Sequence, residues 1–161
     1  MKKLAAQILL AGAAVASAGM FFVEASQKLA VEPAKTQAKK AFDGINQAYE
    51  KGDIDTMMSN IASDASLTII GAEDGNYYVG YENVKNGLKK AAQLRAYKCQ
   101  MTEQSVNVNK SSDVAWIAQK SDCTMAKSGK KVTMRSTAVE IKKDGKWLLI
   151  QAHHSLGTPE E

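Results

Sequence analysis

Residues 113–155 decide the fold, and their sequence is DVAWIAQKSDCTMAKSGKKVTMRSTAVEIKKDGKWLLIQAHHS. Apolar and polar side chains alternate over three segments of this stretch, which is typical of β-strands. Two turn sequences separate the segments: Lys127-Ser128-Gly129-Lys130 and Asp144-Gly145, of which the second is the stronger hairpin signal. The stretch therefore predicts three antiparallel strands joined by hairpins.

The turns also predict which side chains share one face of the sheet. With Asp144-Gly145 as a two-residue loop, Ile141 lies opposite Leu148, and Arg135 lies opposite His154. One face is then apolar near this hairpin, where it carries Trp116, Ala118, Val139, Ile141, Leu148 and Ile150. Farther along, the same face carries the polar residues Lys120, Asp122, Arg135, Thr137 and His154. We interpret this face as the floor of a small-molecule pocket, because such pockets combine an apolar surface with a few polar groups.

The composition is that of one ordinary globular domain. The chain has 161 residues, of which 45% are hydrophobic and 24% are charged. Its formal charge of +4 is spread along the chain in clusters of mixed sign, which argues against nucleic-acid binding.

The first residues predict export rather than part of the fold. Lys2 and Lys3 precede an apolar run that reaches Ala18, the pattern of a secretory signal peptide. We expect a signal peptide over residues 1–25, cleaved after Ala18 or Ala25, and a polar linker over residues 26–35. A periplasmic or secreted protein follows from this interpretation. The alternative is an uncleaved membrane anchor, because the apolar run extends through Val23 to about 20 residues.

Export gives the two cysteines a meaning. A turn centred near Ser111 places Cys99 directly opposite Cys123 on neighbouring antiparallel strands. Opposed cysteines are close enough to form a disulfide in an oxidising compartment, and the crosslink would stabilise the fold by about 3 kcal/mol. The alternative is a pair of unpaired, buried thiols.

The remaining elements complete an α+β domain over residues 36–157, followed by a disordered tail over residues 158–161. Periodicity and capping residues predict helices over 34–51 and 53–60 and from residue 81. The predicted strands cover residues 66–70, 77–79, 97–108, 113–125, 131–142 and 146–155. Because helices come first and the last four strands form an antiparallel meander, we expect the helices to lie on one face of a curved sheet.

Four sequence segments, in this order, resemble the SnoaL-like branch of the nuclear transport factor 2-like superfamily. They are Lys51-Gly52-Asp53-Ile54-Asp55, Asp64-Ala65-Ser66-Leu67-Thr68, Val79-Gly80-Tyr81-Glu82-Asn83-Val84, and Lys143-Asp144-Gly145-Lys146-Trp147 continuing to His153-His154-Ser155. The resemblance implies a cone: a curved antiparallel sheet wrapped round three N-terminal helices, with an internal cavity. It also implies homodimers through the outer sheet face. The stretch from Asp144 to Ser155 is similar to calcium/calmodulin kinase association domains too, which are partner-assembly modules.

The resemblance allows a test for catalytic residues. The steroid-isomerase branch of the superfamily uses a Tyr in the first helix and an Asp on the first strand, positions that Ile45 and Ile69 occupy here. Neither side chain can transfer a proton, which argues against that reaction. Asp122 is the only acid on the predicted floor, and its neighbour Arg135 should keep its pKa low. We expect neither a cofactor nor a metal, because His153 and His154 point to opposite faces of a strand.

Three functions stay open at this point. The first is an exported, non-catalytic protein that binds a small, partly apolar molecule through Trp116, Lys120, Asp122, Arg135, Thr137 and His154. The second is an enzyme of isomerase, lyase or hydrolase type with His154 as its base. The third is a dimeric interaction module whose outer sheet face carries Ala115, Ile117, Gln119, Ala138, Leu149 and Gln151. A structural alternative to ligand contact is also open for the polar end. In it, Asp122, Arg135 and His154 form a row of ion pairs across the strands.

Overall fold

A computed structural model describes residues 31–94 and 96–157 of the chain. After a helix over residues 31–51, the elements are α2 (Ile54–Met58), β1 (Thr68–Ile70), β2 (Tyr77–Val79), α3 (Tyr81–Leu94), β3 (Tyr97–Val108), β4 (Val114–Met125), β5 (Lys131–Lys143) and β6 (Lys146–Leu156). The expected signal peptide and the tail lie outside the described residues. No helix in the described part of the chain is long and apolar enough to cross a membrane.

The helices form where periodicity and capping predict them. Residues 31–35, which we expected to belong to a linker, are already helical. The 31–51 helix buries one stripe of small and apolar side chains, and it ends at Gly52, whose φ of 73° suits glycine. Asp53 caps α2, because its side chain accepts a hydrogen bond from the Thr56 amide at 3.0 Å.

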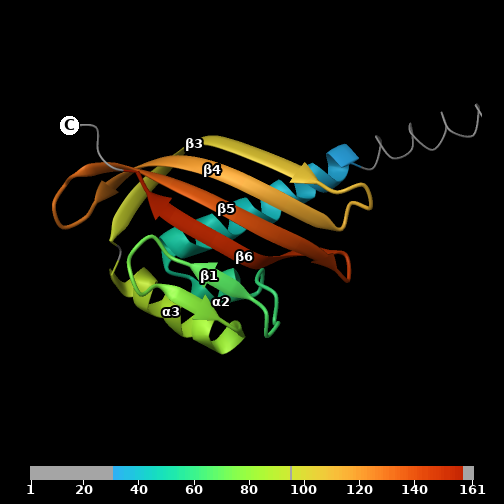
Figure 1. The fold of residues 1–161 in the computed structure, drawn as a ribbon, viewed down its shortest axis with the longest axis horizontal. Coiled ribbons are helices and arrows are strands. Elements are labelled where there is room, and N and C mark those ends of the chain that lie inside the picture. The colour runs from blue at the N-terminus through green and yellow to red at the C-terminus, as the bar shows by residue number, and fades with distance from the viewer. Residues whose placement is uncertain (1–30, 95, 158–161) are drawn as a thin grey trace, which may run out of the picture.

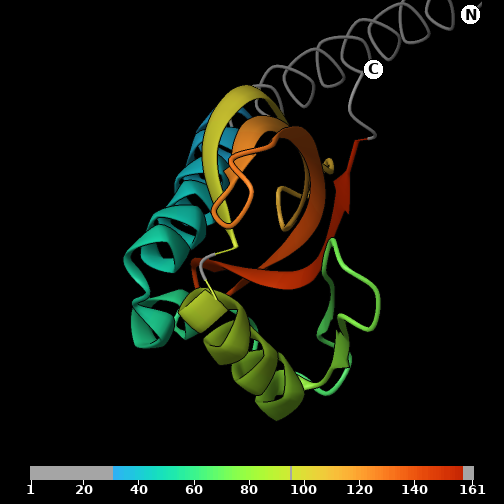
Figure 2. The same cartoon turned by 90° about the vertical axis from the view of Figure 1, so that its left-hand side faces the viewer.

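The six strands form one sheet in the order β2-β1-β6-β5-β4-β3. The predicted meander of β3 to β6 is confirmed, and the short β1 and β2 extend it beyond β6. Since β1 pairs with β6 in parallel, the sheet is mixed rather than wholly antiparallel. The long strands curve strongly, with the 31–51 helix along one side and α3 near β1 and β2 (Figures 1 and 2). The expected α+β cone fold is thus the observed architecture.

The concave face of the sheet is opposite to the face that we predicted. Its buried residues include Ala115 and Ile117 on β4, Ala138 on β5, and Leu149 and Ala152 on β6. All of these except Ala152 were expected on the outer face. The helices supply Phe42, Ile45 and further apolar side chains to the same core. The predicted floor instead lies on the convex face, where Trp116 is 48% exposed.

Charge explains why the sheet curves this way. Lys120, Asp122 and Arg135 are exposed on the convex face. Burying them under the helices would cost several kcal/mol for each unpaired charge. The alternate residues at the same level, Gln119 and Ser121, are neutral and can hydrogen-bond to each other. Near the Asp144-Gly145 hairpin both faces carry apolar side chains, and the concave face also carries Glu140, so that end of the sheet does not determine which face the helices cover.

A bulge in β6 changes the predicted register. Lys143 pairs with Lys146 and Ile141 with Leu148, as the two-residue turn predicts. Beyond them, Glu140 pairs with Leu149 and Val139 with Gln151, so that Ile150 is an extra residue. The pairing of Arg135 with His154 was therefore wrong, and Arg135 faces Ser155 instead.

The other two registers also depart from regular pairing. A turn centred on Ser128-Gly129 would pair Trp116 with Ile141, but the β4–β5 turn is centred one residue earlier and Trp116 pairs with Val139. On β3, a shift between Met101 and Glu103 leaves Thr102 outside the regular pairing. Cys99 still pairs with Cys123, as predicted.

Candidate functional site

A row of four polar side chains crosses the concave face, one from each long strand. Gln104 on β3 pairs with Gln119 on β4, Gln119 with Ser136 on β5, and Ser136 with His154 on β6. Directly paired residues place their side chains on the same face of a sheet. We call Gln104, Gln119, Ser136 and His154 the polar row.

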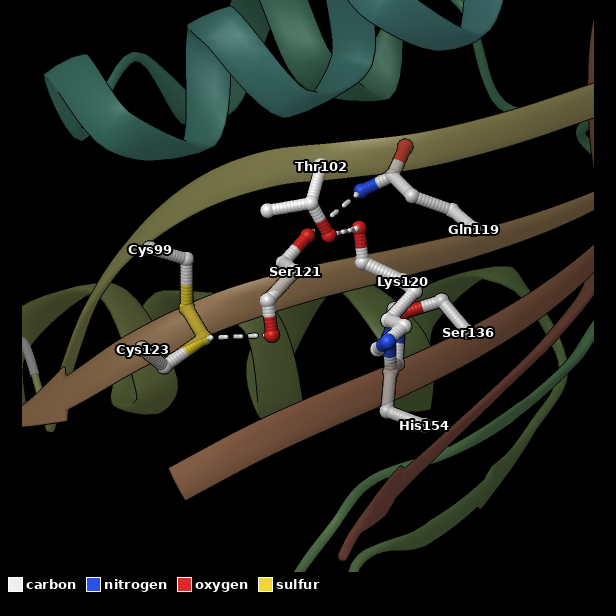
Figure 3. Close-up of a disulfide and its surroundings, with 8 residues drawn as sticks. All are labelled: Cys99, Thr102, Gln119, Lys120, Ser121, Cys123, Ser136 and His154. Carbon is white, nitrogen blue, oxygen red and sulfur yellow. Dashed lines mark hydrogen bonds between the residues drawn. A yellow bond between two sulfur atoms is a disulfide. The ribbon is translucent and has the colours of Figure 1, made fainter. Parts of the chain in front are cut away.

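Hydrogen bonds join the members of the polar row in two pairs. The Ser136 hydroxyl and Nδ1 of His154 are 2.8 Å apart, and Gln104 donates to Oε1 of Gln119 at 3.1 Å. Gln119 donates in turn to the Ser121 hydroxyl at 3.2 Å. Figure 3 shows Gln119, Ser121, Ser136 and His154 on their three strands.

The 31–51 helix covers one end of the polar row and adds two partners. Asn46 donates to Oε1 of Gln119 at 3.3 Å, and Gln104 donates to Asp43 at 2.9 Å. Lys39 forms an ion pair with the other oxygen of Asp43 at 2.7 Å. The Gln104 end of the row is therefore occupied by protein groups, whereas the His154 end has fewer partners.

His154 is the chemically most versatile member of the row. Burial lowers its pKa, and the neighbouring His153 lowers it further, so the imidazole is neutral at pH 7. Nδ1 contacts Ser136, while Nε2 has no hydrogen-bond partner among the described residues. A neutral imidazole with one free nitrogen can hydrogen-bond to a ligand or accept a proton.

The predicted disulfide between Cys99 and Cys123 is present. It joins the edge strand β3 to β4, and Cys123 is buried at 2% exposure. The Thr102 hydroxyl donates to the Lys120 carbonyl at 3.1 Å, so the irregular part of β3 is also tied to β4 (Figure 3). These links hold the first half of β3 in a defined position.

Glu140 is a buried acid that sequence analysis missed. It is fully buried, and neither carboxylate oxygen has a hydrogen-bond partner in the described part of the protein. Burial raises its pKa to about 8, with a further contribution from Asp43, so the carboxyl group is protonated at neutral pH. The sequence signal for its burial is weak. Glu140 alternates with Val139 and Ile141 and so points to the opposite face of β5, but this indicates burial only once that face is known to be the concave one.

The structure does not bring the predicted ligand-binding residues together. His154 lies on the concave face, whereas Trp116, Lys120, Asp122, Arg135 and Thr137 are exposed on the convex face. Lys120 forms an ion pair with Glu103 at 3.2 Å, and Arg135 donates to the Leu156 carbonyl at 3.4 Å. The alternative ion-pair row is not formed either, because no salt bridge joins Asp122, Arg135 and His154.

The positions compared with the steroid isomerases are both in the core. Ile45 is 3% exposed and Ile69 is 5% exposed, and they belong to the same apolar cluster. Across residues 31–94 and 96–157, no three His, Cys, Asp or Glu side chains converge as metal ligands.

Two open depressions mark the described surface. One, of ≈ 360 Å³, lies at the start of α3 and includes Asp64 and Glu82. The other, of ≈ 380 Å³, lies between the 31–51 helix and β3 and includes Lys39 and Gln104. Neither depression includes Ser136 or His154.

Comparisons with known proteins agree with this architecture. The sequence profile of the SnoaL-like domain matches residues 38–159. A nuclear transport factor 2-like protein of unknown function from Pseudomonas putida superimposes with a TM-score of 0.69 at 16% identity, covering 81% of this chain and 91% of that one. Comparison with curated proteins gave no match.

Two further structures carry functional names of their own. A candidate ketosteroid isomerase from Shewanella frigidimarina has a TM-score of 0.65 at 19% identity, over 76% of this chain and 97% of that one. A candidate calcium/calmodulin-dependent protein kinase II association domain from Xanthomonas campestris has a TM-score of 0.60 at 27% identity, over 74% of this chain and 84% of that one. One fold thus carries different functions in its relatives. The profile match and the shared cone fold show that this chain belongs to the SnoaL-like family, within the nuclear transport factor 2-like superfamily.

Proposed function

We propose that this protein is an exported SnoaL-like domain that binds a small, partly apolar molecule at the His154 end of the polar row. The observation that carries the proposal is a neutral, half-buried His154 with a free Nε2, next to the apolar core residues Ala138 and Ala152. Binding sites of this kind combine apolar walls with a few directional polar groups. The signal-peptide pattern and the disulfide support export.

The polar row favours a neutral hydrogen-bonding group on the ligand. Gln119, Ser136 and the neutral His154 offer amide, hydroxyl and imidazole groups but no positive charge. Arg135 and Lys120, the two cations of the predicted floor, are exposed on the convex face and are not available to hold an anionic group at His154. A hydroxyl or carbonyl group beside a hydrocarbon body is therefore the chemistry that this site suits best.

A pair of neighbouring histidines tests the proposal. We would measure ligand-induced thermal shifts against a metabolite panel for the wild type, for His154→Gln and for His153→Gln. His153 is exposed and pairs with Thr137, so its variant is a matched control. Hits that shift the wild type and His153→Gln but not His154→Gln are the expected result. Hits that shift all three proteins equally would show that binding occurs elsewhere.

An enzyme with His154 as its base is the second candidate. The 2.8 Å contact between Ser136 and Nδ1 favours it, because a base that is held by a second group has a defined orientation. Any isomerase, lyase or hydrolase activity on a molecule from the panel should then disappear in His154→Gln and persist in His153→Gln. Binding without turnover leaves the first candidate.

The convex face suits a homodimer. Trp116 is 48% exposed and pairs with Val139, while Ile141 pairs with Val114 and Leu148 on the same face. An exposed apolar patch on a sheet is a frequent protein interface. We infer that two copies associate through this patch, whose residues differ from those that we expected because the sheet curves the other way.

A further inference from the structure

One hydrogen bond joins the two opposite ends of the sheet. Tyr97, at the start of the edge strand β3, donates from its hydroxyl to Oε1 of Glu73 at 3.0 Å. Glu73 lies in the turn between β1 and β2, on the other side of the strand order. In a flat sheet, six strands spaced by about 4.8 Å would separate the two edges by about 24 Å. The curvature brings them together, and Figure 1 shows the β1–β2 turn beside the start of β3.

Tyr49 brings a third element to the same place. It lies near the end of the 31–51 helix and packs against the core. Burial raises its pKa, and the negative charge of Glu73 raises it further. The pKa of Tyr97 is raised mainly by burial and then by its hydrogen bond to Glu73. Both phenols therefore keep their protons at physiological pH, and the Tyr97 hydroxyl donates to Glu73.

The turn that carries Glu73 begins next to His154. Ile70, the last residue of β1, pairs with His153, so Gly71 follows directly beside the His154 end of β6. The base of the turn is fixed, because the Gly71 amide donates to the Asn76 carbonyl at 2.6 Å and Tyr78 donates to the Asn76 side chain at 3.0 Å. Within the described chain, the Glu73 side chain accepts a hydrogen bond from one other side chain, that of Tyr97.

The disulfide holds the Tyr97 side of this contact. Cys99 follows Tyr97 by two residues, so both side chains lie on the same face of β3. The crosslink to Cys123 and the pairing of Tyr97 with Met125 anchor this end of β3 to β4. One side of the contact is therefore anchored to β4. The other side lies in a turn whose own hydrogen bonds are local, including the one that the Asn76 amide donates to the Glu73 carbonyl at 3.2 Å.

We propose that Glu73 and Tyr97 form a latch that holds the turn over residues 71–76 across the open end of the concave face and limits access to His154. The latch gives the proposed function a gate, and its biological purpose rests on that function. Ligand binding then requires the turn to swing away from β3, with its base as the hinge.

Chemical modification of the two histidines tests the latch without a ligand. Diethyl pyrocarbonate acylates the free nitrogen of a neutral imidazole, and tandem mass spectrometry can assign the label to His153 or His154. In the oxidised full chain, Tyr97→Phe should accelerate modification of His154 roughly tenfold, the population change expected for one lost hydrogen bond to a charged group. The exposed His153 is the internal control, and its rate should not change.

Two further variants complete the experiment. Glu73→Ala removes the other half of the latch and should reproduce the effect of Tyr97→Phe. Tyr77→Phe removes the hydroxyl of a 63% exposed tyrosine on β2 and should leave both rates unchanged. The latch is wrong if His154 is modified at the same rate in Tyr97→Phe and in the wild type. It is also wrong if modification of His153 and His154 accelerates equally, because that result would indicate a general loosening of the fold. If both latch variants accelerate modification of His154 but no ligand changes the melting temperature, the latch is supported and the proposed ligand binding is contradicted.

Discussion

The Ser136 hydroxyl lies 2.8 Å from Nδ1 of His154, because a bulge at Ile150 brings these residues opposite each other on β5 and β6. Without the extra residue, the charged and exposed Arg135 would pair with His154 and the imidazole would face solvent. A single inserted residue thus turns His154 into a group of the concave face.

Removing the Ser136 hydroxyl should destabilise the protein. Ser136→Ala leaves Nδ1 of the half-buried His154 without its partner, which costs about 1 kcal/mol. Urea unfolding monitored by tryptophan fluorescence measures the change in the free energy of unfolding. Thr137→Ala, at the exposed neighbouring position, is the control and should change it by no more than about 0.5 kcal/mol. Equal effects in the two variants would contradict a specific Ser136–His154 contact.

Glu140 predicts a loss of stability as the pH rises. Its pKa is about 8 in the folded protein and 4.5 in the unfolded reference, so the folded state binds the proton more tightly and stability falls between these pH values. Glu140→Gln, which mimics the protonated form, should therefore stabilise the protein at pH 7 by up to about 3 kcal/mol and have little effect at pH 4. Urea unfolding at both pH values checks this, with the exposed Glu50→Gln as control. A pH-independent effect would mean that Glu140 does not carry the proton.

His154 predicts the opposite dependence in acid. Burial lowers its pKa in the folded state below the ordinary 6.5, so the unfolded state binds more protons and stability decreases as the pH falls below about 6.5. His154→Gln should make the stability curve flatter between pH 7 and pH 5 than that of the wild type. Histidine NMR titration of the folded protein would give the pKa of His154 directly, and a value at or above 6.5 would contradict the prediction.

The disulfide should make a large contribution to stability. The double variant Cys99→Ser/Cys123→Ser should lose about 3 kcal/mol of unfolding free energy, because the crosslink closes a loop with a sequence separation of 24 residues. The wild type in excess dithiothreitol should show the same loss, which serves as the matched control. Titration of denatured, unreduced wild type should detect no thiol, and two thiols per chain would refute the crosslink in the native protein.

The convex patch predicts a dimer that a single charge disrupts. Trp116→Lys places a charge in the centre of the apolar patch and should shift the protein from dimer to monomer in light scattering coupled to size-exclusion chromatography. Thr124→Lys adds the same charge to an exposed position on the same strand and should leave the dimer intact. A monomeric wild type at micromolar concentration would contradict the inferred interface.

Local patterns in the sequence determined much of this protein. The alternation in residues 97–156 and the Asp144-Gly145 turn predict the four long strands, and opposed cysteines predict the disulfide. The Asp144-Gly145 hairpin is also correct in register, because both residues adopt the positive φ that this turn type requires. Such features depend on neighbours in the chain or in one strand pair, and those neighbours are visible in the sequence.

The direction of curvature and the bulge at Ile150 were decided only by the tertiary structure. Near the hairpin, both faces carry several apolar side chains, so alternation alone does not tell which face the helices cover. The choice depends on the cost of burying Lys120, Asp122 and Arg135 as against Gln119, Ser121 and Ser136, a comparison across several strands. The segment Leu148-Leu149-Ile150-Gln151 carries no turn residue that would mark a bulge. Both events arise from packing between distant segments, and together they placed His154 inside and Arg135 outside.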